Sequence, residues 1–336
     1  MTCEKIATIL VSLLIISTVV STVQAINLNS AKISILKNPP HPLKNGETHY
    51  WGVIIGIFEY KNGAQLPSSA VDKMFNAMLS SKNWNRDNLR FITNEKATKE
   101  GIRSAIRWLA SVSDENDFVF FYYNGHCSQF PDDNGDEKDG KDEALIPYEY
   151  NSSKENPIIR DDELGQWLDE IKAKGLCLAF DTCHSGGLVE EKSHLSSDYI
   201  RVKDISNGFI NDIKGDNRVI IVSSGEKFLT YIDRAFGGLL TIGLGNAFKG
   251  LADFNQDKIC TAEEAFTLTE IFHIAAYSGL TASSIAMGFI NPVLALCIPA
   301  AVIIVELITY LNYHSFAFSF AIMYDNYDGE LPIIEL

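Results

Sequence analysis

The chain has 336 residues, of which 28 are basic and 43 acidic, so its net charge is −15. This length allows one large α/β domain or two smaller ones with a substantial hydrophobic core. The excess of negative charge argues against nucleic acid as a partner and favours a surface that attracts cations or basic peptides. We therefore expect no nucleic acid among its partners.

The N-terminal stretch predicts export from the cytoplasm. Lys5 precedes a long apolar run, and the small residues of "VQA" suit cleavage after Ala25. We expect a signal peptide over residues 1–25 and a polar linker over 26–47. The alternative is an uncleaved N-terminal anchor. Both place the rest of the chain in a secreted or extracytoplasmic location.

Apolar runs and helical patterns then alternate along the chain. The predicted strands are 51–57, 89–93, 118–123, 176–180 and 219–224, and the predicted helices are 69–81, 98–112 and 161–174. Most strand runs are continuously apolar, as expected of parallel strands that are covered on both faces. The pattern predicts an α/β fold with a mostly parallel central sheet of about six strands and helices on both faces.

A histidine and a cysteine follow two of these strands. His126 comes just past 118–123 in "FVFFYYNGHC", and Cys183 comes just past 176–180 in "LCLAFDTCHS". In open parallel sheets, ligand sites form beyond the carboxyl ends of the strands. Both side chains therefore leave the sheet from the same edge, as a cysteine peptidase requires.

Several motifs in this region resemble one family. The segments "YYNGHC", "DEALIP", "RDDEL" and "LAFDTCHSGG" are similar to the metacaspase branch of the caspase-like cysteine peptidases, and the resemblance extends over roughly residues 48–270. It implies a caspase-hemoglobinase-like three-layer sandwich, with the catalytic domain over 48–278. The alternative for Cys183 is a structural thiol in an unrelated α/β domain.

The resemblance also implies catalytic roles. Cys183 would be the nucleophile and His126 the general acid and base, and the backbone N–H groups of Cys183 and Cys127 would form the oxyanion hole. The family has glycine where this chain has Cys127. If that position requires a conformation that glycine adopts easily, a side chain would displace the N–H donor. The chain would then be a weak enzyme or a pseudopeptidase. A regulatory disulfide between Cys127 and the nucleophile is another reading.

Substrate preference follows from the acidic residues that the family uses. Asp181 matches the metacaspase acid that reads Arg or Lys before the scissile bond. Its alternative role is a carboxylate that accepts N–H bonds at the turn after the strand. The family's second acid falls on Ala70, and the nearest carboxylate is Asp72, two residues later on a different helix face. The substrate is thus expected to be a peptide or protein with a basic P1 residue.

Seven carboxylates crowd the segment 131–144, where they repel one another unless water or cations intervene. By the resemblance, the calcium ligands would be Asp142, Asp161, Asp162 and Glu190, and oxygen ligands of this kind suit Ca²⁺. The alternative is that Asp161 and Asp162 only cap their helix. A second loop, 253–264, has EF-hand-like spacing with a lysine where glycine is usual, and we expect a degenerate loop there rather than a bound ion. We expect no organic cofactor.

The C-terminal region contains a long hydrophobic stretch. Residues 285–305 carry no charge, and a stretch of this length is long enough to cross a bilayer once as a helix. We expect a membrane-inserted segment over 279–323, with membrane contact through 285–311, and a segment 324–336 that returns to the catalytic domain. A buried hydrophobic hairpin or an oligomer interface is the alternative.

The sequence therefore predicts an extracytoplasmic, membrane-associated cysteine endopeptidase, stimulated by calcium, that cleaves after Arg or Lys. One alternative is a peptidase of the same clan with a different P1 preference, such as the legumain-like or clostripain-like enzymes. The other is a caspase-like pseudopeptidase that serves as a membrane-linked binding module.

Overall fold

The computed structural model describes residues 48–66, 69–135, 140–151, 157–184, 208–223, 238–272 and 321–336, and only the main chain of Ser69, Cys183 and His184. The expected signal peptide, the linker and nearly all of the hydrophobic segment 279–323 lie outside these residues. Among the helices of the described part, none is long and apolar enough to cross a membrane.

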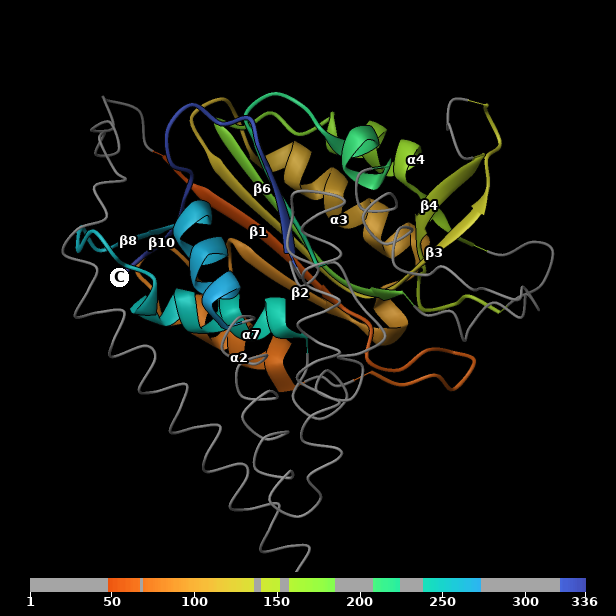
Figure 1. Cartoon of the computed structure of the whole chain (residues 1–336), viewed down its shortest axis with the longest axis horizontal. Helices are drawn as coiled ribbons and strands as arrows, with labels where there is room; N and C mark the ends of the chain where they lie inside the picture. Colours follow the sequence, from red (N-terminus) through yellow and green to blue (C-terminus); the bar gives the residue numbers. More distant parts are fainter. Residues whose placement is uncertain are drawn as a thin grey trace, which may run out of the picture. The chain divides into compact units, whose positions relative to one another are not determined.

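A mixed sheet forms the centre of the fold (Figure 1). Its main path runs in the order β2, β1, β3, β6, β7 and β9, with β4 and β5 attached beside β3. The strands are β1 (Tyr50–Gly56), β2 (Leu89–Thr93), β3 (Phe118–Pro131), β4 (Lys141–Leu145), β5 (Ile159–Arg160), β6 (Gly175–His184), β7 (Arg218–Ser223) and β9 (Ala321–Asp325). Pairs along β2, β1, β3, β6 and β7 are parallel, so the predicted α/β class with a mostly parallel sheet is confirmed.

Two of the predicted strands are longer in the structure than in the sequence analysis. β3 continues to Pro131 because its second half pairs antiparallel with β4, and β6 continues to His184 because it stays in register with β3. The placement of His126 and Cys183 just past their strands is therefore wrong, since both lie within the strands. The physical reason is cross-strand pairing, of β3 with β4 beyond His126 and of β6 with β3 as far as His184, which the sequence did not reveal.

One face of the sheet is covered by α3 (Lys99–Val112) and α4 (Asp161–Leu168) (Figure 1). α3 begins where the Thr98 hydroxyl accepts the N–H of Gly101 at 3.0 Å, a cap that typically stabilises a helix by about 1 kcal/mol. Its apolar stripe, Ile102, Ala105, Ile106 and Leu109, is buried in one core cluster with alternate residues of β1, β3 and β6. α4 is shorter than predicted, because the chain turns after Leu168.

The opposite face is covered by α2 (Ser69–Leu79) and α7 (Leu239–Asn246), which continues into the π-helical turn η3 (Ala247–Leu251). α2 and α7 pack closely: a Cβ at Gly245 would lie 3.4 Å from Met74 Cα, at ordinary van der Waals contact. Phe248 meets Phe120 of β3 edge-on, with ring centroids 5.7 Å apart. Helices on both faces thus make three layers, as predicted.

The last residues of the chain add two strands to the edge of this domain. β9 pairs antiparallel with β7, and β10 (Pro332–Glu335) pairs antiparallel with β8 (Ile259–Thr261). The Trp84 indole and the Asn83 amide both donate to the carbonyl of Ile333, at 2.8 Å. In the segment that follows the hydrophobic stretch, β9 therefore joins the central sheet and β10 forms a separate two-stranded sheet with β8.

Candidate active site

Neighbouring strands bring together the two residues with predicted catalytic roles. In the parallel pair β3–β6, the Cα partner of His126 is Cys183, and the next pair is Cys127 with His184. Adjacent strands lie about 4.8 Å apart, so residues 126 and 183 are backbone neighbours. They stand near the carboxyl end of β6, where the parallel pairing of β3 with β6 ends, and α/β folds place their sites at such ends.

The imidazole of His126 is buried and held by an aromatic ring. Its side chain stacks on Tyr60, with ring centroids 4.9 Å apart and planes inclined by 29°. Burial lowers the pKa of His126 from 6.5 to about 4, because water no longer stabilises the charged form. Its Nδ1 finds no hydrogen-bond partner among the residues that the structure describes. At neutral pH the imidazole is therefore an uncharged base.

Cys127 sits in β3 without the backbone strain that its replacement of glycine raised as a concern. The non-glycine residues with positive φ in the described chain are Asn94, Asn217, Gln256 and Lys258. Because side chains alternate along a strand, the Cys127 thiol lies on the opposite face of β3 from His126. It is a buried, free cysteine, and burial raises its thiol pKa far above the usual range, so it stays protonated.

Asp181 is a buried carboxylate that engages a helix N-terminus. It accepts the backbone N–H of Thr241 at 3.0 Å and also the Thr241 hydroxyl, which contacts the hydroxyl of Tyr122. A Cβ at Gly238 would lie 2.0 Å from the carboxylate, so only glycine allows this approach. The alternative role, acceptance of N–H bonds, is thus present, although the donor comes from α7 rather than from a turn after the strand.

Asp72 lies on the exposed side of α2, whereas Ala70 and Met74 are buried against the core. As an acid in the first turn, Asp72 complements the positive N-terminal end of the helix. Its position gives a structural reason for a carboxylate there. The described contacts do not join Asp72 to Asp181.

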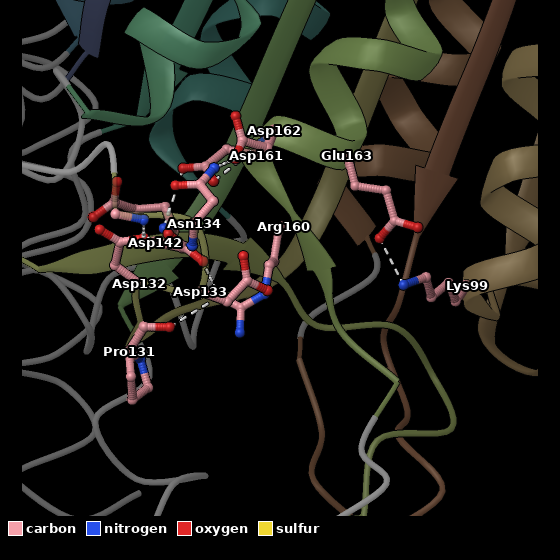
Figure 2. A network of polar contacts seen from close by, with 12 residues as sticks. Lys99, Pro131, Asp132, Asp133, Asn134, Asp142, Arg160, Asp161, Asp162 and Glu163 are labelled. Atoms are coloured by element: carbon pink, nitrogen blue, oxygen red, sulfur yellow. Dashed lines mark hydrogen bonds and ion pairs between the residues drawn. The ribbon is translucent and has the colours of Figure 1, made fainter.

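The predicted calcium ligands on β4 and α4 do gather in space (Figure 2). Asp142 is at the start of β4, and Asp161 and Asp162 open α4 directly after β5. Asp162 accepts from the amide of Asn134, and Asp161 accepts the N–H of Glu143 at 3.1 Å. The strand pairing of β4 with β5 positions these carboxylates side by side.

The balance of charge in this acidic cluster is unusual. Burial, with a smaller contribution from the carboxylate of Asp142, raises the pKa of Asp161 from 3.8 to about 7. Arg160 forms ion pairs with Asp142 and, through Nε at 2.8 Å, with Asp133. Glu190 lies outside the described residues, and among those described no three side chains form a metal-binding group. The oxygen ligands of this cluster suit Ca²⁺, but the carboxylate of Asp142 already forms an ion pair with Arg160.

The EF-hand-like loop 253–264 keeps the turn of such loops but uses its acids internally. Lys258 adopts the left-handed conformation, with φ of 70°. Glu264 accepts the N–H groups of Phe254 and Thr261, each at 3.2 Å, and burial raises its pKa to about 7. Glu264 therefore fixes the main chain of its own loop, and a degenerate loop without a bound ion stays a prediction.

Three residues near these sites were missed by the sequence analysis. Tyr60 contacts His126, Thr241 contacts Asp181, and Arg160 contacts Asp142. Tyr60 and Thr241 are distant in the chain from their partners and carry no local motif. Arg160 directly precedes the acidic pair of "RDDEL", so charge complementarity there was a usable signal.

Comparison with known proteins covers the segment that holds His126 and Cys183. Residues 53–192 match the family profile described as "Metacaspase, peptidase C14 domain". Metacaspase-1 of Eremothecium gossypii is 31% identical over 148 residues, covering 41% of this chain and 32% of that protein. Metacaspase-1 of Schizosaccharomyces pombe is 37% identical over 102 residues, covering 29% of this chain and 23% of that protein. These matches show that this segment of the chain is similar to the peptidase domain of metacaspases.

The chain spans about a third of the length of the first curated relatives that it matches. Among solved structures, a protein from Geobacter sulfurreducens aligns with a TM-score of 0.45 at 18% identity, over 66% of this chain and 88% of that one. The structure of pro-sf-caspase-1 aligns with a TM-score of 0.43 at 10% identity, over 88% of this chain and 97% of that one.

Proposed function

We propose that this chain is a cysteine endopeptidase of the metacaspase type, with Cys183 as nucleophile and His126 as general acid and base. The observation that carries the proposal is the pairing of His126 with Cys183 in adjacent parallel strands, within the segment that matches the peptidase profile. A histidine beside a cysteine at the carboxyl edge of a sheet has the parts needed for acyl transfer.

The buried imidazole supports a specific order of proton transfers. Because the pKa of His126 is lowered to about 4, the neutral ring can accept the proton of the Cys183 thiol as the thiolate attacks the substrate carbonyl. The imidazolium then gives that proton to the leaving amine, which leaves an acyl-enzyme. Water, deprotonated by the same imidazole, hydrolyses the thioester and returns the thiol.

The oxyanion would be stabilised by the backbone N–H groups of Cys183 and Cys127. Cys127 stays in register with His184 in the β3–β6 ladder, so its N–H serves the substrate only if it is not held by that ladder. Cys127→Gly tests this point. A rise in kcat with little change in KM would show that the side chain restricts the donor, and an unchanged kcat would show that it does not.

Preference for Arg or Lys at P1 is proposed on the buried carboxylate of Asp181. Its hydrogen bonds with Thr241 fix its position but also satisfy part of its charge. For this reason a second candidate remains, a peptidase of the same clan with another P1 residue such as Asn. Asp181→Asn should reduce cleavage after Arg and Lys far more than cleavage after Asn if Asp181 reads the basic side chain.

The decisive experiment incubates the full chain with fluorogenic peptides that end in Arg, Lys, Asn or Asp, with and without millimolar calcium. Cys183→Ala is compared with Cys177→Ala, which removes a buried thiol from the same strand. Hydrolysis that is lost only in Cys183→Ala supports the nucleophile, and equal hydrolysis by both variants overturns it. A folded wild type that cleaves no peptide and resists alkylation at Cys183 would be a binding module instead.

Calcium stimulation is proposed on the acidic cluster of Asp142, Asp161 and Asp162, with Glu190 as a further ligand. Calcium would supply positive charge that lets the buried Asp161 ionise. The chain's own part is to hold the oxygens together at the start of α4, and Arg160 must release Asp142 for the ion to bind. A calcium-dependent rise in melting temperature that Asp161→Asn abolishes would support this.

The extracytoplasmic location and the membrane contact through 285–311 are proposed from the sequence, and the structure bears on the topology of that segment. Because the chain resumes in β9 and β10, a hydrophobic segment that enters and leaves the membrane from one side fits better than a single crossing. Protease protection of tags placed before residue 279 and at the C-terminus tests this, since a single crossing would protect only one tag.

A further inference from the structure

Tyr60 lies in a tight loop directly after the first strand. β1 ends at Gly56, and the loop is closed by hydrogen bonds from Tyr60 N–H to Ala64 and from Gly63 N–H to Tyr60, both at 2.8 Å. Gly63 takes a left-handed φ of 89°, which permits the turn. The Tyr60 side chain is 2% exposed, so the loop presents a fixed, buried ring to the candidate active site.

The Tyr60 hydroxyl accepts a hydrogen bond from the main chain of β3, just beyond the point where pairing with β1 ends. Pairing between β1 and β3 stops at Gly56 with Asn124, and the last bond runs from Ile57 N–H to the Asn124 carbonyl at 2.9 Å. Two residues later the N–H of His126 donates to the Tyr60 hydroxyl at 2.7 Å. The carbonyl of His126 accepts from Ile146 N–H at 3.0 Å. Tyr60 therefore completes the hydrogen bonding of the His126 backbone.

The glycine before His126 is explained by the same contact. A Cβ at Gly125 would lie 3.0 Å from the Tyr60 hydroxyl and 2.5 Å from the Tyr123 hydroxyl. Tyr123 in turn donates to the carbonyl of Ile146 at 2.9 Å. Both hydroxyls reach the strand only because residue 125 has no side chain.

We propose that Tyr60 is the positioning residue for the catalytic histidine and for the main chain that follows it. Its ring supports the face of the imidazole, and its hydroxyl fixes the amide of His126 and so the peptide that leads to Cys127. The ring matters because Nδ1 has no hydrogen-bond partner in the described part of the chain to orient it. This inference rests on the proposed peptidase.

The two contacts can be separated by substitution. Tyr60→Phe keeps the ring and removes only the hydroxyl, and we expect kcat to fall about fivefold with KM within twofold, since one neutral hydrogen bond contributes about 1 kcal/mol. Tyr60→Leu also removes the stacked ring. We expect a further fall in kcat, and the His126 pKa should rise from about 4 toward 6.5 as water reaches the imidazole.

The experiment measures kcat, KM and the pH dependence of kcat/KM for the full chain, and follows the His126 pKa by NMR of labelled histidine. Tyr150→Phe is the matched control, because Tyr150 is equally buried in the same core cluster, and its kinetics should stay within twofold of wild type. The proposal is overturned if Tyr60→Phe keeps the wild-type kcat, or if Tyr60→Leu leaves the His126 pKa unchanged while the fold is intact. Loss of hydrolysis in Cys183→Ala, tested in parallel, separates failure of this proposal from failure of the peptidase assignment.

Discussion

Burial shifts the pKa of His126, in β3, and the pKa of Asp161, at the start of α4, in opposite directions. His126 is 8% exposed and Asp161 is 2% exposed. Removal from water lowers the pKa of the imidazole to about 4 and raises the pKa of the carboxyl to about 7. In both places burial disfavours the charged form, so near pH 7 the imidazole is neutral and about half of the Asp161 carboxyl groups are protonated.

The residues around each group determine which chemistry the group can take part in. His126 lies in register with a cysteine, which can give it a proton, and beside Tyr60, which orients it without adding charge. Asp161 lies beside Asp142, so its ionisation needs a compensating cation. One region is therefore suited to moving a proton, and the other to responding to a positive ion.

The largest effect is expected at the proton-transfer region. His126→Gln removes the base but keeps a planar polar side chain, and we expect kcat to fall by about 10³, within the range found for general acid–base catalysis. Initial rates on the best basic peptide measure it. His49→Gln, at an exposed histidine, is the control. A fall of less than tenfold in His126→Gln would remove the imidazole from the mechanism.

The acidic cluster should show its effect in stability. The folded-state pKa of Asp161 is raised from 3.8 to about 7, so its contribution is full below pH 3.8 and is lost as the pH rises through 7. Without calcium, the free energy of unfolding of Asp161→Asn should rise relative to that of wild type by up to ~4 kcal/mol across this pH interval. Urea unfolding between pH 4 and 8 measures this difference in the free energy of unfolding, and added calcium should reduce the difference. Parallel curves for the two proteins would contradict the shift.

His126 predicts the opposite pH dependence. Its folded-state pKa is depressed from 6.5 to about 4, so its contribution is present above pH 6.5 and is lost as the pH falls through 4. Wild type should lose up to ~3 kcal/mol relative to His126→Gln over that interval. The same unfolding series tests it, and an equal loss in both proteins would mean that the imidazole is not buried as a neutral group.

The smallest effect concerns Arg160, which forms an ion pair with Asp142 and would compete with calcium for it at the proposed site. Its guanidinium is only partly exposed, and ion pairs of this kind contribute up to about 1 kcal/mol. Arg160→Gln should therefore tighten calcium binding by about fivefold in calorimetry. Arg107→Gln, which removes an exposed pair with Glu100 on α3, should leave the affinity unchanged. Weaker binding in Arg160→Gln would show that Arg160 supports the site instead.

Most of the sheet could be predicted from the sequence because most of its strands are runs of apolar residues. The predicted runs 89–93 and 118–123 begin at the first residues of β2 and β3, since continuous apolar segments have few other stable environments. The extension of β3 to Pro131 could not be predicted in the same way. Its polar second half is held by pairing with β4, a contact between segments separated by a loop.

The amino-acid sequence by itself determined the α/β alternation, the motif that carries the peptidase resemblance, and the presence of His126 and Cys183 directly after two apolar runs that form strands. Only the tertiary structure decided that those strands are neighbours in register, that Tyr60 holds His126, and that Thr241 engages Asp181. Periodicity and motifs record local geometry along the chain, whereas these contacts depend on which distant elements the folded core brings together.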